Sequence, residues 1–352
     1  MIQEVLSQLG DREVYIYGAG CWGNLFYQYC KGKEIPVAGY IVTDVNSISI
    51  SNGLPVYGIN DYVEKKKNGQ IVVCMYYPKS VERTLAENFI TDGYSLKYEE
   101  LLVIVKEMSL RYLPKNSYDL EQKIIYVKGA RYVNPFIFDD MYFWEWFMEA
   151  IDIIFPTEFH DDSLLNEGPY EYKQARMKQG DVVFDLGSAG GTFAQLALGK
   201  GCSVYGFEPS PRNFEYLEHV QKIYGGADWK IYSEAVSNFC GEHDFYTGGE
   251  SMGYDGFREL DDLKEKVQVN TITLDVFVER EGIEKVDFIK ANIEGAERMM
   301  LQGAREVIRK YHPILSMRTN HDPDDPKILE GLIKEIDDSY VVIQCWRNLY
   351  AW

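Results

Sequence analysis

The sequence predicts an α/β protein with two Rossmann-like domains, because a strand, a glycine-rich turn and a helix start follow one another at two places. The first start covers residues 13–23, and the second covers 181–191, about 170 residues later. Strand-like and helix-like stretches alternate after each start, which is typical of parallel sheets with crossover helices. We therefore expect Rossmann-like domains over residues 1–96 and 166–352, joined by a helical, aromatic-rich connector over 97–165.

In the first domain, strands are expected at 13–17, 36–42 and 71–76, and helices at 21–31 and 79–90. Gly18, Gly20 and Gly23 form the pattern G-x-G-x-x-G after the first strand, and Asp44 follows at the end of the next strand. This is the dinucleotide-binding fingerprint in its usual context. No hydride-transfer site is evident, so three interpretations stay open: a nucleotide or nucleotide-sugar site, a scaffold or dimer surface, and an NAD(H) site.

The connector shows no strong strand pattern, and helices are expected at 98–112 and 140–152. It carries an aromatic cluster, made of Tyr132, Phe136, Phe138, Tyr142, Phe143, Trp144, Trp146 and Phe147. These side chains fit either a wedge between the two domains or one wall of an acceptor pocket.

The second domain alternates regularly between the two element types. Strands are expected at 181–186, 203–208, 229–236, 242–247, 267–273, 286–291, 312–318 and 340–346. Helices are expected at 191–199, 211–223, 274–280, 295–308 and 326–336. We expect a seven-stranded sheet whose last strand, 340–346, runs antiparallel to the others.

The glycine loop of the second domain differs from a phosphate loop and from a dinucleotide loop. It lacks the lysine of GxxxxGK[ST], and its glycines do not follow GxGxxG. Asp185, Gly187 and Gly191 instead fit a carboxylate near the ammonium group of a methionine-like moiety, with glycines that let the ligand approach. Glu208 ends the next strand, 23 residues after Asp185, where a carboxylate can accept both ribose hydroxyls. Together these residues favour S-adenosylmethionine as the cofactor.

Residues from about 165 to 340 resemble the FkbM family of methyltransferases. The resemblance rests on four segments: 180–187, 207–209 with Asn213 and Phe214, 235–238 with Gly241, and 286–297. It implies a class I methyltransferase fold and O-methylation of a hydroxyl on a sugar, glycan or natural product, as in polysaccharide biosynthesis. The first domain resembles a small nucleotide-sugar-binding domain that is fused to some enzymes of surface-glycan pathways.

The resemblance and the glycine loop together suggest which residues hold the cofactor. The candidates are Tyr170, Glu171, Asp185, Gly187, Ser188, Gly191, Glu208, Pro209, Ala235 and Asn292.

The chain departs from the family pattern at Asn292, where the family usually has Asp. An amide cannot act as a carboxylate base, so the base for an alcohol acceptor lies elsewhere or the activity has drifted to a binding role. The catalytic candidates are Asn292, Glu294 and His321, at the carboxyl ends of the fourth and fifth strands. His321 could instead cap the following helix, and Glu294 could be a first-turn residue. A divalent ion among these oxygens is a weaker alternative, and we expect no metal.

The charge and the apolar pattern exclude several classes of partner. The formal net charge is −19, and every part of the chain is acidic, which argues against nucleic acid and anionic membranes. No apolar run is long enough for a membrane span. Six cysteines without a CxxC pair suggest free thiols in a reducing compartment. We expect a cytoplasmic protein, which could form homo-oligomers, with a small-molecule or glycan acceptor.

Overall fold

The computed structural model describes residues 13–133 and 169–352 with gaps. The gaps are 20, 44–49, 65–68, 75–78, 89, 91–92, 98–99, 102, 105–106, 109–117, 120–123, 128–129, 227, 248–254, 259–264 and 346. The chain divides into two compact units: the described residues up to 108 belong to the first, and residues 118–133 and 169–352 belong to the second.

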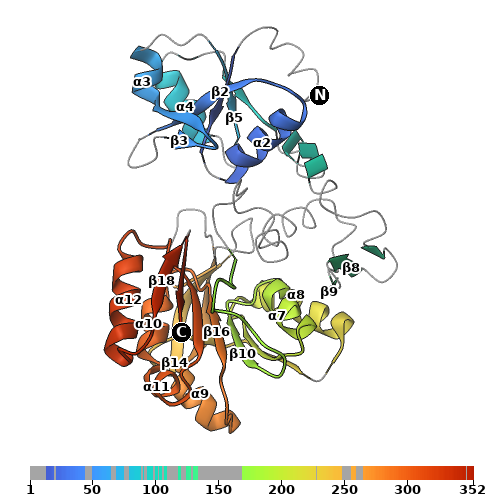
Figure 1. The fold of residues 1–352 in the computed structure, drawn as a ribbon, viewed down its shortest axis with the longest axis vertical. Coiled ribbons are helices and arrows are strands. Elements are labelled where there is room, and N and C mark those ends of the chain that lie inside the picture. Colours follow the sequence, from blue (N-terminus) through green and yellow to red (C-terminus); the bar gives the residue numbers. More distant parts are fainter. Residues whose placement is uncertain are drawn as a thin grey trace. The chain divides into compact units, whose positions relative to one another are not determined.

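The first unit contains a six-stranded sheet in the order β3-β4-β2-β1-β5-β6 (Figure 1). Its strands are β1 (Val14–Tyr17), β2 (Val37–Val42), β3 (Ile50–Ser51), β4 (Leu54–Gly58), β5 (Gln70–Val73) and β6 (Tyr94–Ser95). All neighbours pair in parallel except β3, which is antiparallel to β4. The helices are α2 (Cys21–Gly32), α3 (Ile59–Glu64) and α4 (Lys79–Glu87).

Two short strands and one helix between 50 and 64 were not expected from the sequence. The expected strand 71–76 is observed as Gln70–Val73, and the expected helix 79–90 ends at Glu87. The extra strand β4 pairs with β2, and α3 buries Ile59 and Tyr62. Segments this short show too little periodicity to be recognised by pattern.

The connector is not helical throughout. Residues 118–133 include three antiparallel strands: β7 (Tyr118–Asp119), β8 (Ile124–Val127) and β9 (Ala130–Val133). This sheet belongs to the second unit, where the N–H of Val133 donates to Gln195 Oε1 at 2.5 Å and Gln195 Nε2 donates to the carbonyl of Val133 at 3.1 Å. The run of isoleucine, tyrosine and valine at 124–127 favours a strand, a preference that the expectation of a helical connector missed. The expected helix 140–152 lies outside the described residues.

The second unit is built on a seven-stranded sheet in the order β12-β11-β10-β16-β17-β19-β18. The strands are β10 (Val182–Leu186), β11 (Ser203–Phe207), β12 (Trp229–Tyr232), β16 (Phe288–Ala291), β17 (Ile314–Arg318), β18 (Val342–Cys345) and β19 (Asn348–Ala351). The helices are α7 (Thr192–Gly199), α8 (Pro211–Tyr224), α9 (Leu274–Glu281), α10 (Glu297–Gln302), α11 (Arg305–Tyr311) and α12 (Asp325–Ile336).

The expectation that strand 340–346 runs antiparallel to the rest of the sheet is wrong. The structure has two strands there, and it is β19 that runs antiparallel, between β17 and the edge strand β18. Only two positions separate β18 from β19, so the chain must reverse as a hairpin and β18 keeps the direction of β17. The expected helix 295–308 is also divided into α10 and α11, and the break includes Gly303, where a Cβ would lie 2.1 Å from the carbonyl oxygen of Ser237.

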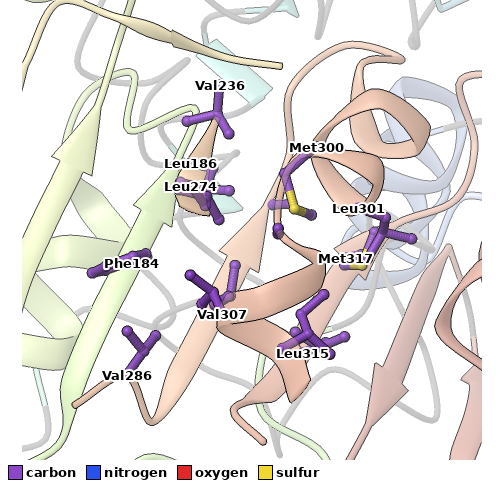
Figure 2. Close-up of a cluster of buried hydrophobic side chains, with 14 of the residues drawn as sticks. Phe184, Leu186, Val236, Leu274, Val286, Met300, Leu301, Val307, Leu315 and Met317 are labelled. Atoms are coloured by element: carbon purple, nitrogen blue, oxygen red, sulfur yellow. The ribbon is translucent and has the colours of Figure 1, made fainter. Parts of the chain in front are cut away.

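Alternate residues along the strands face two different helix layers. Val183, Val204 and Phe288 pack with side chains of α7 and α8. Phe184 and Leu186 point the other way and pack with side chains of α9, α10, α11 and α12. Figure 2 shows part of this second cluster, with Met300, Leu301 and Val307 close to Leu315 and Met317. The period of two along each strand produces this double-layered core.

A small second sheet interrupts the alternation between β12 and β16. It consists of β13 (Ala235–Val236), β15 (Glu265–Ile272) and β14 (Gly241–Thr247), in that order. β13 is parallel to β15, and β14 is antiparallel to it. This insertion matters because Ala235, Val236 and Phe245 line the pocket described next.

Candidate cofactor pocket

A pocket lies at the carboxyl ends of β10, β11 and β16. Residues at these strand ends and in the β13–β15 sheet line it, and the empty space within it and at its open mouth is about 610 Å³. Open α/β sheets bind their ligands in the crevice outside the carboxyl ends of the strands, at the point where the strand order reverses. The side chains that reach the pocket therefore decide which ligand it accepts.

A close backbone contact requires glycine at the first glycine position of the loop after β10. Gly187 has φ of 76°, and a Cβ would lie 1.9 Å from the carbonyl oxygen of Asn292. The N–H of Asn292 donates to the carbonyl of Leu186 at 3.1 Å, so two chain segments meet where β10 and β16 end. Ser188 is buried, and its Oγ donates to the carbonyl of Asp185 at 2.9 Å. Gly187 and Ser188 thus shape the turn that forms the pocket floor.

Glu208 places its carboxylate in the pocket wall directly after β11. Oε2 accepts from the N–H of Ala189 at 2.8 Å, and Oε1 accepts from the N–H of Ser210 at 3.0 Å. The side chain is 5% exposed, and burial raises the pKa of Glu208 from 4.5 to about 7 although both hydrogen bonds lower it. Each oxygen retains acceptor capacity for a further donor. Glu208 is therefore suited to accept ligand hydroxyls.

Asp185 does not line the pocket; it is fully buried against Lys290. Lys290 Nζ lies 2.9 Å from Asp185 Oδ1 and donates to the carbonyls of Leu186 at 3.1 Å and Gly187 at 2.7 Å. Burial opposes the charged lysine, but Asp185 outweighs it, and the pKa of Lys290 is raised. The ion pair joins the glycine loop to β16. The expectation that Asp185 lies beside a ligand ammonium group stays a prediction.

Tyr170 and Glu171 also lie outside the pocket lining. The buried ring of Tyr170 lies under two cations, with Lys290 Nζ at 5.4 Å and Arg318 Cζ at 4.8 Å from its centre. Glu171 pairs with Lys200 at 2.5 Å. Cation–π contact and the ion pair hold the segment before β10 in place.

Glu294 faces the pocket, and His321 lies behind it. His321 Nε2 is 3.4 Å from Glu294 Oε1, and Nδ1 is 3.2 Å from Glu297 Oε1. Burial favours the neutral imidazole, but the two carboxylates outweigh it and raise the pKa of His321 to about 10. His321 is therefore a cation at neutral pH and has no lone pair for a substrate proton. Of the sequence candidates for a base, Glu294 is the titratable group in the pocket.

Two acidic residues of the pocket were missed by sequence reasoning. Glu234 accepts hydrogen bonds from Arg280 at 2.6 and 2.8 Å, and Asp255 is 9% exposed. They precede and follow strands of the inserted sheet, where no motif marks them. With Glu208 and Glu294 they make four carboxylates in the lining, and none of the described lining residues is a lysine or arginine. Arg280 offsets the charge of Glu234, and the His321 cation offsets that of Glu294, so the lining is acidic in character without a large net negative charge and disfavours phosphates.

The structure therefore separates the expected cofactor residues into two groups. Those that line the pocket are Gly187, Glu208, Pro209, Ala235 and Asn292. Those that do not are Tyr170, Glu171, Asp185, Ser188 and Gly191. Gly191 precedes α7 with φ of 74°, and a Cβ there would lie 2.8 Å from the ring of Trp229.

The first glycine loop is closed on itself where it is described. A Cβ at Gly23 would lie 1.8 Å from the carbonyl oxygen of Gly18, and the N–H of Gly18 donates to the carbonyl of Ile41 at 2.9 Å. These contacts require a small residue at Gly23 for packing of α2 on the turn. Gly20 and Asp44 lie outside the described residues.

Two features are absent from the described part of the chain. It contains no group of three His, Cys, Asp or Glu side chains arranged to hold a metal ion. None of its helices has the length and apolar character needed to cross a membrane.

The family described as "Methyltransferase FkbM domain" matches residues 185–340. The chain thus contains a methyltransferase domain of the FkbM type, which implies methyl transfer that depends on S-adenosylmethionine. This confirms the resemblance over residues 185–340. No curated protein matches the chain.

Several solved structures are similar at low identity. Methyltransferase FkbM from Methylobacillus flagellatus KT is 16% identical with a TM-score of 0.43, over 100% of this chain and 93% of that chain. Aeropyrum pernix fibrillarin, solved with S-adenosyl-L-methionine, is 16% identical with a TM-score of 0.31, over 50% and 67%. A SAM-dependent methyltransferase from Aquifex aeolicus is 12% identical with a TM-score of 0.30, over 58% and 90%.

Proposed function

We propose that this protein is an S-adenosylmethionine-dependent O-methyltransferase that acts on a hydroxyl of a sugar, glycan or natural product. The observation that carries the proposal is the lining of the pocket at the carboxyl ends of β10, β11 and β16. Glu208 lies there among carboxylates, and the part of the lining that the structure describes has no lysine or arginine. A sulfonium ligand that carries no phosphate suits this electrostatic environment, whereas a pyrophosphate ligand does not.

The residues present fit the cofactor. Glu208 can accept ribose hydroxyls, because both of its oxygens are held by backbone N–H groups and still have acceptor capacity. Ala235 and Pro209 supply small or apolar surface beside it, which suits a nucleobase. When bound, the cofactor supplies an activated methyl group on a positively charged sulfur.

Glu294 is the residue best placed to handle the acceptor hydroxyl. Its carboxylate faces the pocket next to Asn292, and its backbone is held at φ of 52°, a conformation that a non-glycine residue adopts at a cost. His321 fixes the carboxylate from behind and balances its charge. Glu294 would accept the proton of the hydroxyl as its oxygen attacks, and the Asn292 amide would hydrogen-bond to the acceptor.

Calorimetric binding of S-adenosylhomocysteine tests the cofactor. Wild-type protein should bind it with micromolar affinity, and Glu208→Ala should lose that binding. NADH and UDP-sugars are titrated in parallel, because the first unit could hold a nucleotide. Absence of S-adenosylhomocysteine binding, with binding of NADH or a UDP-sugar, would contradict the proposal and move the ligand to the first glycine loop.

A methyl-transfer assay with a panel of sugars and hydroxylated natural products then tests the acceptor class. Glu294→Gln should lower kcat by about 10²-fold or more on the acceptor found, while leaving S-adenosylhomocysteine binding intact. Transfer to nitrogen or carbon acceptors only would refute the O-methyltransferase assignment.

A further inference from the structure

Asp255 has a carboxylate oxygen for which the described part of the chain offers no partner. The side chain is 9% exposed and lines the pocket. Its Oδ2 accepts from Ser210 Oγ at 2.6 Å and from Thr247 Oγ1 at 2.7 Å. Its Oδ1 is buried without a hydrogen-bond donor. A buried acceptor of this kind is costly unless a ligand supplies the donor.

Ser210 connects this carboxylate with Glu208. The N–H of Ser210 donates to Glu208 Oε1 at 3.0 Å, and its Oγ donates to Asp255 Oδ2 at 2.6 Å. Asp255 is also close enough to contribute to the raised pKa of Glu208. The two carboxylates therefore lie on either side of one residue and line the same pocket.

We propose that Asp255 is a second ribose-binding residue, whose Oδ1 accepts a hydrogen bond from one hydroxyl of the nucleoside while Glu208 accepts from the other. This inference rests on the proposed function. A vicinal diol presents two donors on neighbouring carbons, which match two carboxylates that flank Ser210. The apolar side chains Phe207, Val236 and Phe245 leave the remaining lining for the base. The same pair of charges repels a ribose that carries a phosphate, so Asp255 also helps to exclude phosphorylated nucleosides.

The test compares wild type with Asp255→Asn by calorimetry. The variant keeps the shape of the side chain, but when its amide oxygen accepts from Ser210 and Thr247, its NH₂ group replaces Oδ1 and faces the ligand as a donor. Affinity for S-adenosylhomocysteine should fall at least tenfold. Asp244→Asn is the matched control, because Asp244 is an exposed carboxylate on β14 paired with Lys266, and it should bind as wild type does.

Analogues of S-adenosylhomocysteine identify the donor. The 2′-deoxy and 3′-deoxy analogues should both bind wild type more weakly, and for one of them Asp255→Asn should cause no further loss, because the interaction is already absent. If the inosine analogue shows this behaviour instead, the donor is the adenine amino group and the proposal is overturned. Unchanged affinity in Asp255→Asn would also overturn it.

The outcomes separate the two proposals. Failure of wild type to bind S-adenosylhomocysteine would refute the proposed function together with this inference. Binding by wild type with no effect of Asp255→Asn would refute the inference alone. If the variant does not fold, Asp255→Ser takes its place in the same titrations, and loss of wild-type affinity on removal of only one hydroxyl would also refute the two-carboxylate ribose site.

Discussion

Replacement of Glu208 by Gln should change how stability depends on pH. Burial raises the pKa of the folded-state carboxyl from 4.5 to about 7, so between these values the folded protein binds a proton that the unfolded chain does not. Wild-type stability therefore falls as pH rises through this window. At about 1.4 kcal/mol per pH unit, the free energy of unfolding should lose about 2.5 kcal/mol between pH 5 and pH 8 through this residue. The Gln variant cannot lose a proton there and lacks this contribution.

Urea denaturation of both proteins at half-unit steps from pH 5 to 8 measures the effect. A constant offset is expected, because the Gln NH₂ cannot accept from the N–H of Ala189 or Ser210, but only the pH-dependent part of the difference is diagnostic. Glu242→Gln controls for the loss of one formal charge, since Glu242 is exposed. Parallel pH profiles for wild type and Glu208→Gln would refute the reasoning and show that Glu208 is charged throughout this range.

Three further predictions concern the framework of the site. Gly187→Ala should destabilise the protein by at least about 3 kcal/mol in chemical denaturation, because its Cβ meets the Asn292 carbonyl; the control Gly180→Ala, with φ of 85° and open space, should cost only about 1–2 kcal/mol. Lys290→Met should lower the free energy of unfolding by about 3–5 kcal/mol, because it leaves Asp185 buried and unpaired. The control Lys285→Met removes an exposed ion pair with Asp287 and should lower it by less than about 1 kcal/mol in the same assay. Equal effects of the two substitutions would contradict the buried pair. His321→Asn should lower the thermal midpoint most at pH 7 or below, and the difference from wild type should close towards pH 10. The reason is that the raised pKa of His321 stabilises the fold fully below pH 6.5, and this contribution is lost as pH rises through about 10. A difference that stays constant with pH would argue against the imidazolium.

Local chemistry explains which features were predictable. Gly187 and Glu208 were recognised because a tight turn and a strand-end carboxylate leave short, contiguous patterns. The strands around them have a period of two with strong apolar residues, so their positions were expected within a few residues. The hairpin of β18 and β19 was missed because only two residues separate the strands, and the division between them depends on pairing with β17.

Long-range contacts explain which features could not be predicted from the sequence. Asp185 and Lys290 are 105 positions apart in the chain, and only the parallel pairing of β10 with β16 joins them. His321 has the sequence appearance of a base, yet its position between Glu294 and Glu297 makes it a cation. Asp255 belongs to no motif and reaches the pocket only because Ser210 and Thr247 converge on it.

The sequence by itself therefore determined the class of the C-terminal domain and the strand end at which a ligand binds, because both depend on periodicity and on motifs a few residues long. The tertiary structure decided which carboxylates face that ligand, which are neutralised by buried cations, and which histidine remains charged. Those properties depend on burial and on the distance between groups far apart in the chain, and neither is set until the sheet and its helices have packed.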